Sequence, residues 1–222
     1  MVVASDAVPL DRRHRRRRET IEEVLDHAVQ IMAEDGVAGL SLGEIARRME
    51  MRPPSLYVYF PSKHALYDAL FARGWRLLLD RMRASEEEHP SVEDDLRVIM
   101  LRVGNDFVRW SVENFAYAQL LFWRPVPGYR PSEAAYEPAV ELYQQSSARL
   151  AALKQRGLLR ADVDVEVALR DWTVLVSGVI SQQLANEPGE PFESGRFAAA
   201  MPELAAMFAN YYGNPARDRA SS

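Results

Sequence analysis

Hydrophobic residues recur at a helical period along most of the chain. In the first clear segment they stand three or four positions apart and form one continuous face, made by Ile21, Val24, Leu25, Ala28, Val29 and Met32. No stretch shows the strict alternation of apolar and polar residues that is typical of a half-buried strand. The pattern therefore predicts an all-α protein, with an N-terminal head of three helices and a larger helical body.

Helix start and stop signals divide the head. Thr20 and the acidic residue three positions later form a capping-box pattern, which predicts a helix over residues 20–35, although this helix could extend back into the preceding arginines. Gly36 is placed to end it in a left-handed turn. Ser41 and Glu44 form a second capping box, which opens a short helix.

A third short helix is expected to open at Pro53 and Pro54 and to run through Tyr59. Proline is tolerated in a first turn because its missing N–H has no helical partner there. Pro61 closes this helix, and Ser62 starts a long fourth helix.

The body shows five further helical segments, at about 92–113, 115–124, 132–157, 164–187 and 196–212. Pro202 is expected to kink or split the last one. The segment 164–187 is apolar on almost every side and carries small residues at Ser177, Gly178 and Ser181. Together with Met207 and the alanines of the last segment (Ala198, Ala199, Ala205 and Ala206), it predicts a four-helix interface in a two-fold homodimer.

The second and third helices, joined by a tight turn, follow the helix-turn-helix plan. Leu56 and Phe60 stand four positions apart and can anchor the third helix inward. The residues left outward are Pro53, Pro54, Ser55, Tyr57, Val58 and Tyr59. Two tyrosine hydroxyls and a serine on so short a helix are unusual for a surface unless something is bound, and the helix-turn-helix plan makes DNA the expected partner; the alternative is a polar-faced connector helix.

Charge and composition narrow the function further. The chain has 222 residues and a net charge of −5, but its first 63 residues are neutral overall, with basic clusters that suit contact with a polyanion. There is no cysteine, which excludes disulfides, thiolate metal sites and cysteine nucleophiles. No apolar run approaches the ~20 residues of a membrane helix, and no signal peptide is visible, so we expect a cytoplasmic protein without a membrane partner.

The six arginines between Arg12 and Arg18 have two interpretations. They form either a disordered solubilising tail or an arm that tracks DNA in an adjacent groove. The expected organisation is a disordered basic arm over 1–19, a helix-turn-helix domain over 20–66, and a helical dimerisation and ligand-binding domain over 67–222.

Residues 20–70 resemble the DNA-binding domain of the TetR family of bacterial regulators. The resemblance lies in Ile21–Gly36, in Gly39–Ala46 and in the stretch Pro54–Leu66. It implies that Pro53, Pro54 and Tyr57 face base edges, whereas the residues that reach phosphates are Ser41, Ser55, Tyr59 and Lys63.

Two positions depart from the family pattern. Gly43 stands where a side chain that contacts DNA is common, and Glu50 stands in the turn where glycine is usual. Arg52, at the start of the third helix, could compensate by reaching a guanine.

Aromatic residues of the body could line a ligand cavity, and the six that we single out are Phe107, Trp110, Phe122, Trp123, Tyr143 and Trp172. The alternative is that they are simply core residues. A cavity of this lining would take a small lipophilic effector.

An enzyme is not expected, because no catalytic motif stands out. His64 and Asp68 are four residues apart on one helix, but two candidate ligands without a third do not predict a metal site, and no cofactor is expected. The sequence therefore predicts a transcriptional regulator that binds a palindromic operator in double-stranded DNA and responds to a small lipophilic ligand. We expect it to act as a repressor. The alternatives are a DNA-binding regulator without a ligand and a small-molecule enzyme on a helical scaffold.

Overall fold

The computed structural model describes residues 8–89 and 95–215, and within these ranges every element is helical. The head contains α1 (Val8–Asp35), α2 (Leu42–Arg48), α3 (Pro53–Leu56) and the start of α4 (Lys63–Glu88). The body adds α5 (Leu96–Glu113), α6 (Phe115–Trp123), α7 (Glu133–Gln155), α8 (Val165–Asn186) and α9 (Met201–Tyr212), with two short 3-10 turns, η1 (Val37–Gly39) and η2 (Ala198–Ala200). The all-α prediction is confirmed.

Side-chain caps fix where most of these helices begin. The hydroxyls of Ser41, Ser62 and Ser132 each accept a hydrogen bond from the backbone N–H three residues later, at the starts of α2, α4 and α7. Asp95 and Asp164 cap α5 and α8 with a carboxylate in the same way. Gly36, directly after α1, has a φ of 77° and a ψ of 161°, so the helix ends at the expected glycine, but in an extended positive-φ conformation and not in the expected left-handed turn.

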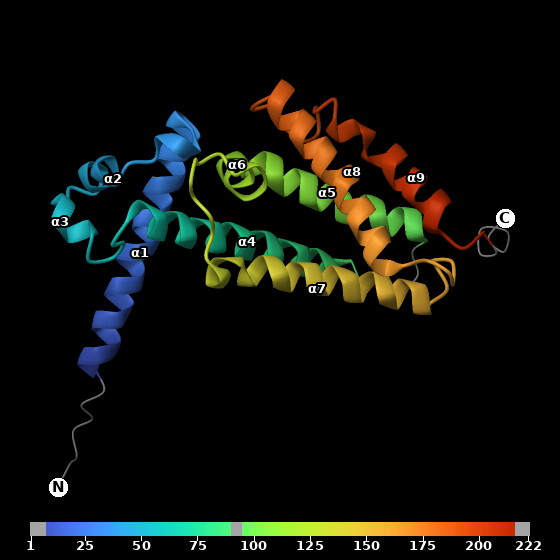
Figure 1. Cartoon of the computed structure of the whole chain (residues 1–222), viewed down its shortest axis with the longest axis horizontal. Helices are drawn as coiled ribbons and strands as arrows, with labels where there is room; N and C mark the ends of the chain where they lie inside the picture. The colour runs from blue at the N-terminus through green and yellow to red at the C-terminus, as the bar shows by residue number, and fades with distance from the viewer. Residues whose placement is uncertain (1–7, 90–94, 216–222) are drawn as a thin grey trace, which may run out of the picture.

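The expectation of a disordered arm is wrong for residues 8–19, which the structure describes as helical. Residues 8–19 continue α1 toward the N-terminus as one helix of 28 residues (Figure 1), while residues 1–7 lie outside the described part. Arginine is among the better helix formers, and no proline or glycine interrupts 10–35. Arg15 and Glu19 add an ion pair at 3.6 Å, one turn apart.

Two other helix boundaries differ from expectation. The third helix stops at Leu56, and the backbone N–H groups of Tyr59 and Phe60 both donate to the Leu56 carbonyl in the turn that follows. Pro202 lies in the first turn of α9, so the expected last segment is split into η2 and α9 and is not kinked, because the proline occupies a position that needs no donor.

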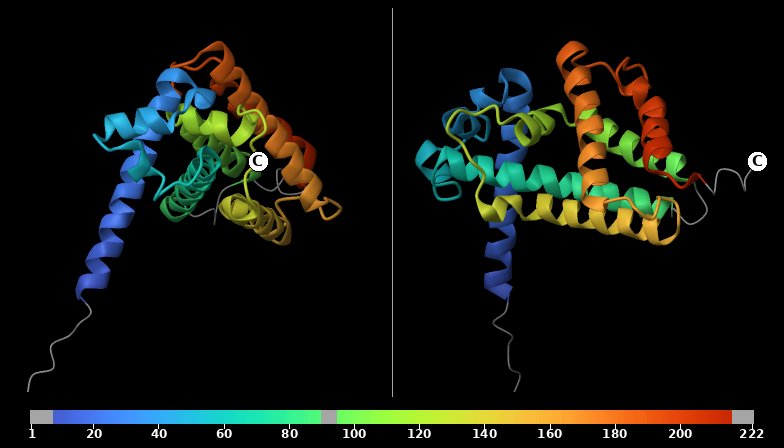
Figure 2. Two further views of the ribbon diagram at one scale, coloured as in Figure 1. Left: turned by 60° about the vertical axis from the view of Figure 1, so that its left-hand side comes forward. Right: turned by 45° about the vertical axis from the view of Figure 1, so that its right-hand side comes forward.

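Two hydrophobic clusters hold the fold together. The first joins the head to α4, α6 and α7, and the second packs α5, α8 and α9 around Trp172 and Phe208. Helix α4 begins in the head and ends deep in the body, parallel beside α7, while α8 and α9 lie side by side at the opposite edge (Figures 1 and 2). The expected boundary at 66/67 falls inside α4, so head and body share one continuous helix.

Candidate DNA-binding surface and body cavity

The helix-turn-helix unit is built on buried side chains of α2 and α3. Ile45, Ala46 and Leu56 are fully buried, and Phe60 is 5% exposed, so both short helices are anchored against α1 and α4. Between them Glu50 takes a φ of 54°, in the left-handed region that favours glycine. This turn sets the angle between α2 and α3.

The outward side of α3 carries the residues expected to face base edges. Pro53, Pro54 and Ser55 are exposed, and Tyr57 is 51% exposed directly after the helix. Arg52 precedes α3 in an extended conformation and is also exposed. The structure therefore brings these five side chains together on one surface with no core role to explain them.

The residues expected to reach phosphates lie around the same surface, some with intramolecular partners. The Ser41 hydroxyl caps α2, and the Lys63 ammonium donates to the Ala38 carbonyl at 3.2 Å. The guanidinium of Arg17 lies 5.1 Å from the ring centroid of Tyr59 and donates to the Val58 carbonyl at 3.4 Å. Sequence reasoning missed this contact, because it treated Arg17 as part of a disordered segment.

An ion-pair network stiffens α2 behind this surface. The Glu44 carboxylate accepts from Arg47 at 2.7 Å and from Arg48 at 2.9 Å, and Arg48 also pairs with Glu34 of α1 at 2.5 Å. The hydrogen bonds from Arg47 and then Arg48 lower the pKa of Glu44 to about 2. These contacts engage Arg47 and Arg48 within the head.

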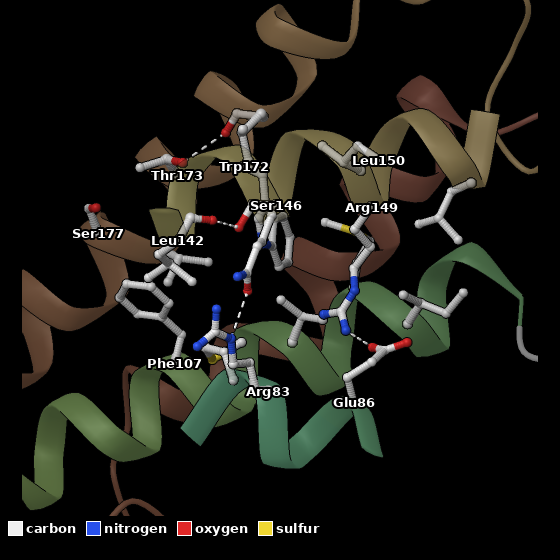
Figure 3. A pocket seen from close by; sticks show the side chains of 18 of the residues that line it. Arg83, Glu86, Phe107, Leu142, Ser146, Arg149, Leu150, Trp172, Thr173 and Ser177 are labelled. Atoms are coloured by element: carbon white, nitrogen blue, oxygen red, sulfur yellow. Dashed lines mark hydrogen bonds and ion pairs between the residues drawn. The ribbon is translucent and has the colours of Figure 1, made fainter. Parts of the chain in front are cut away.

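The body contains a cavity of about 350 Å³ between α4, α5, α7 and α8. Its apolar wall includes Phe107, Leu142, Leu150 and Trp172 (Figure 3). This size is at the lower end of the ~300–1,000 Å³ of small-molecule sites, and the mostly apolar lining is typical of them.

Charged side chains occupy one side of the cavity. Arg83 of α4 pairs with Glu141 and donates to Gln145 of α7 at 3.3 Å, while Arg149 of α7 pairs with Glu86 of α4 (Figure 3). Burial lowers the pKa of Arg149, so its charge is held in a poorly solvated place. These polar groups were missed, because in sequence they resemble the ordinary solvated faces of two long helices.

The structure does not bring the six singled-out aromatic residues together. Phe107 and Trp172 line the cavity, whereas Phe122 and Trp123 line a second hollow between α6 and α8. Trp110 is 6% exposed and belongs to the first hydrophobic cluster, and Tyr143 is half exposed and donates to Glu166. Periodicity shows that a residue faces inward but not which neighbour it contacts. For this reason the sequence could not show that Trp110, Phe122, Trp123 and Tyr143 lie outside the cavity.

The outward side of α8 and α9 carries exposed apolar residues. Val174 is 65% exposed, and on α9 Met207 and Tyr211 are 60% and 66% exposed. The small residues Ser177 and Gly178 lie on the same exposed side of α8. Two of the alanines expected in this interface, Ala198 and Ala205, are instead buried in the second hydrophobic cluster of the same chain.

Comparison with known proteins assigns the head. Residues 24–70 match the family described as bacterial regulatory proteins, tetR family. The uncharacterized HTH-type transcriptional regulator YobS of Bacillus subtilis is 32% identical over 98 residues, which are 44% of this chain and 49% of YobS. The chain thus spans about half the length of the curated relatives that it matches.

Solved structures match nearly the whole chain in fold. A Rhodococcus protein of unknown function superposes with a TM-score of 0.72 at 18% identity, covering 87% of this chain and 95% of that one. FadR from Bacillus subtilis, solved in complex with stearoyl-CoA, superposes with a TM-score of 0.64 at 15% identity, covering 85% and 97%. At these identities the likeness concerns the fold alone. The described residues hold no group of three or more His, Asp or Glu that could bind a metal, and none of the described helices is long and apolar enough to cross a membrane.

Proposed function

Because this chain belongs to the TetR family of bacterial regulatory proteins, with the family domain at residues 24–70, we propose that it is a sequence-specific repressor that binds a palindromic operator as a homodimer. One observation carries the proposal: the exposed surface formed by Arg52, Pro53, Pro54, Ser55 and Tyr57 is anchored from behind by the buried Leu56 of α3 and by Phe60 after it. Such a surface can enter a major groove while the fold stays intact. A protein that occupies an operator with both heads blocks access to the DNA beneath it.

Within this surface, each residue has a proposed role. Pro53, Pro54 and Tyr57 contact base edges, and Arg52 reaches a guanine at the start of α3. Ser41, Ser55, Tyr59 and Lys63 hold phosphates. Lys63 must exchange its bond to the Ala38 carbonyl for a phosphate oxygen, which keeps the number of its hydrogen bonds unchanged.

Operator binding is tested by two substitutions with matched controls. Tyr57→Ala should weaken binding to a selected operator by about 1–3 kcal/mol and blur preference at one base pair, whereas Lys63→Ala should weaken all sequences alike. Tyr143→Ala removes a tyrosine of equal exposure in the body, and Lys154→Ala removes the other lysine of the chain. If gel-shift titrations show neither Tyr57→Ala nor Lys63→Ala impaired beyond these controls, the DNA-binding surface is wrongly assigned.

The homodimer is proposed to form through the outward side of α8 and α9. The exposed Val174, Met207 and Tyr211 supply apolar surface, and Gly178 has open space around its α-carbon, which permits close approach of a second helix. Paired helices from two copies would link the two heads at a fixed spacing. That spacing suits half-sites about 34–36 Å apart.

Ligand control is proposed to act through the cavity and α4. The cavity takes a small, mostly lipophilic molecule whose ring packs between Phe107 and Trp172, with a polar group toward Arg83 or Arg149. The structure of FadR with stearoyl-CoA supports the ability of this fold to hold an apolar ligand. Helix α4 has 26 residues and is about 39 Å long, so a small tilt at the cavity moves the start of α4 beside α3.

This part of the proposal is tested by a screen of hydrophobic metabolites and drugs. Binding should quench Trp172 fluorescence, and Trp172→Phe should remove that signal. A true effector must release the operator and, by linkage, bind more weakly when operator is present. Ser146→Phe, which fills the cavity, should abolish the response. Release that survives this substitution would place the effector elsewhere, and a protein with no responding compound would be a DNA-binding regulator without a ligand.

Enzymatic activity is not part of the proposed function. The family and the curated relatives are named as transcriptional regulators. Turnover of a cavity ligand by a protein that fails to retain DNA would favour the small-molecule enzyme instead.

A further inference from the structure

The N-terminal part of α1 is a basic helix that stands apart from the body. Residues 8–19 project beyond the other helices in all three views (Figures 1 and 2). Six arginines over positions 12–18 are exposed, and residues 8–19 contain only two acidic side chains. Of the six, Arg15 forms an ion pair with Glu19. So strong a positive charge along one helix is suited to a polyanion.

Arg17 connects this helix to the turn that follows α3, beside the proposed DNA-binding surface. Its guanidinium lies over the Tyr59 ring and donates to the Val58 carbonyl, both in the turn directly after α3. Arg13 lies one helical turn before Arg17 and therefore on the same side of α1, whereas Arg12 and Arg15 project from the opposite side. A tail that only improved solubility would need neither a continuous helix nor this interaction.

We propose that residues 8–19 form a second DNA-binding element, which binds the phosphate backbone next to each half-site without reading its sequence. The inference rests on the proposed operator binding. The helix of 12 residues is about 18 Å long, which matches the axial length of about five base-pair steps. Because α1 runs without a break into the head, every phosphate bound by this helix also fixes how α3 meets its groove.

The test compares two double variants that remove the same charge. Arg13→Ala/Arg17→Ala changes the side of α1 that faces the turn after α3, and Arg12→Ala/Arg15→Ala is the matched control on the other side. Fluorescence anisotropy would follow binding to a selected operator and to a random-sequence duplex of equal length over a series of salt concentrations. Circular dichroism would verify that both variants keep their helix content.

The expected result is a change in salt dependence that differs between the two variants. Each arginine that no longer neutralises a phosphate reduces the slope of log affinity against log salt by about 0.9, so removal of two arginines per protomer should reduce the slope of a dimer by about three to four units. Arg13→Ala/Arg17→Ala should show this decrease on both duplexes, and the control should change by less than one unit. Hydroxyl-radical footprinting should show protected positions in the wild type that become reactive in the first variant alone.

Two results would overturn the inference. Equal slopes for the two variants would mean that the helix supplies only diffuse charge. Binding to vesicles that contain phosphatidylglycerol, with a dependence on Arg13 and Arg17 that duplex DNA lacks, would make the partner an anionic lipid surface. The random-sequence duplex separates this inference from operator binding: a wild type that does not prefer the operator refutes the proposed function, while the slopes still test the helix.

Discussion

The left-handed residue in the turn between α2 and α3 offers a sharp test of how this head is built. Glu50 has a φ of 54°, a conformation that costs a residue with a side chain about 1–2 kcal/mol. Glycine removes that cost but adds about 0.4–1 kcal/mol of chain entropy to the unfolded state. Glu50→Gly should therefore raise the free energy of unfolding by about 0.5–1 kcal/mol, or the Tm by about 1–4 °C.

The same substitution removes a negative charge beside the proposed DNA-binding surface. At about 10 Å from a phosphate in water, one charge contributes about 0.4 kcal/mol, so two per dimer should tighten operator binding about two- to four-fold at low salt. Glu50→Gln separates the two effects, because it removes the charge and keeps the left-handed side chain. We expect tighter binding in both variants and higher stability in Glu50→Gly alone.

Differential scanning calorimetry and anisotropy titrations would measure these quantities. A Glu50→Gly protein that unfolds at or below the temperature of Glu50→Gln would refute the argument from backbone strain. Unchanged affinity in both variants would show that Glu50 lies away from the DNA.

Three further predictions concern the dimer, the body and α2. Val174→Glu should yield folded monomers with weaker operator binding, whereas Val179→Glu, at a position buried in the chain's own core, should unfold the protein; sedimentation and circular dichroism distinguish the two. Gly104→Ala would place a Cβ 2.9 Å from the Trp172 ring, so it should cost about 1–3 kcal/mol in thermal unfolding and alter the tryptophan emission. The pKa of Glu44 is lowered from its ordinary value of 4.5 to about 2, so its pairing stabilises the fold above about pH 4.5 and this stabilisation disappears as the pH falls toward 2. Glu44→Gln should therefore be less stable at pH 7, and its deficit in Tm should shrink over that acid range; a constant deficit would contradict the pairing.

Local signals in the sequence predict the head well. Ser41, Ser62 and Gly36 mark helix ends by their own chemistry, and the spacing of Leu56 and Phe60 orients α3, so the exposed surface proposed to bind DNA follows from short-range rules. Contacts between segments that are distant in the sequence were harder to predict. Phe107 and Trp172 meet at one cavity although 65 positions separate them, and nothing in either helix alone indicates it.

One error and one ambiguity have specific physical causes. A run of arginines is compatible with a helix as well as with a coil, and composition alone favoured the coil for residues 8–19. In α8 apolar residues occupy nearly every side, so the helical period could not distinguish Val174, which is exposed, from Val179, which is buried. Only the positions of α5 and α9 against α8 decide between them.

The hydrophobic cluster that joins the head to α6 limits how this protein can be rebuilt. Tyr67 donates to the Val37 carbonyl at 2.7 Å, and Tyr117 and Leu120 of α6 are buried in the same cluster as Val24 of α1. A chimera that carried this head on the body of another regulator would leave α6-facing residues of α1 without their partners and would form a poorly matched core. Exchange of whole heads is therefore costly here, and if Arg52 and Tyr57 read bases as proposed, new operator preferences are more readily reached through these two exposed side chains.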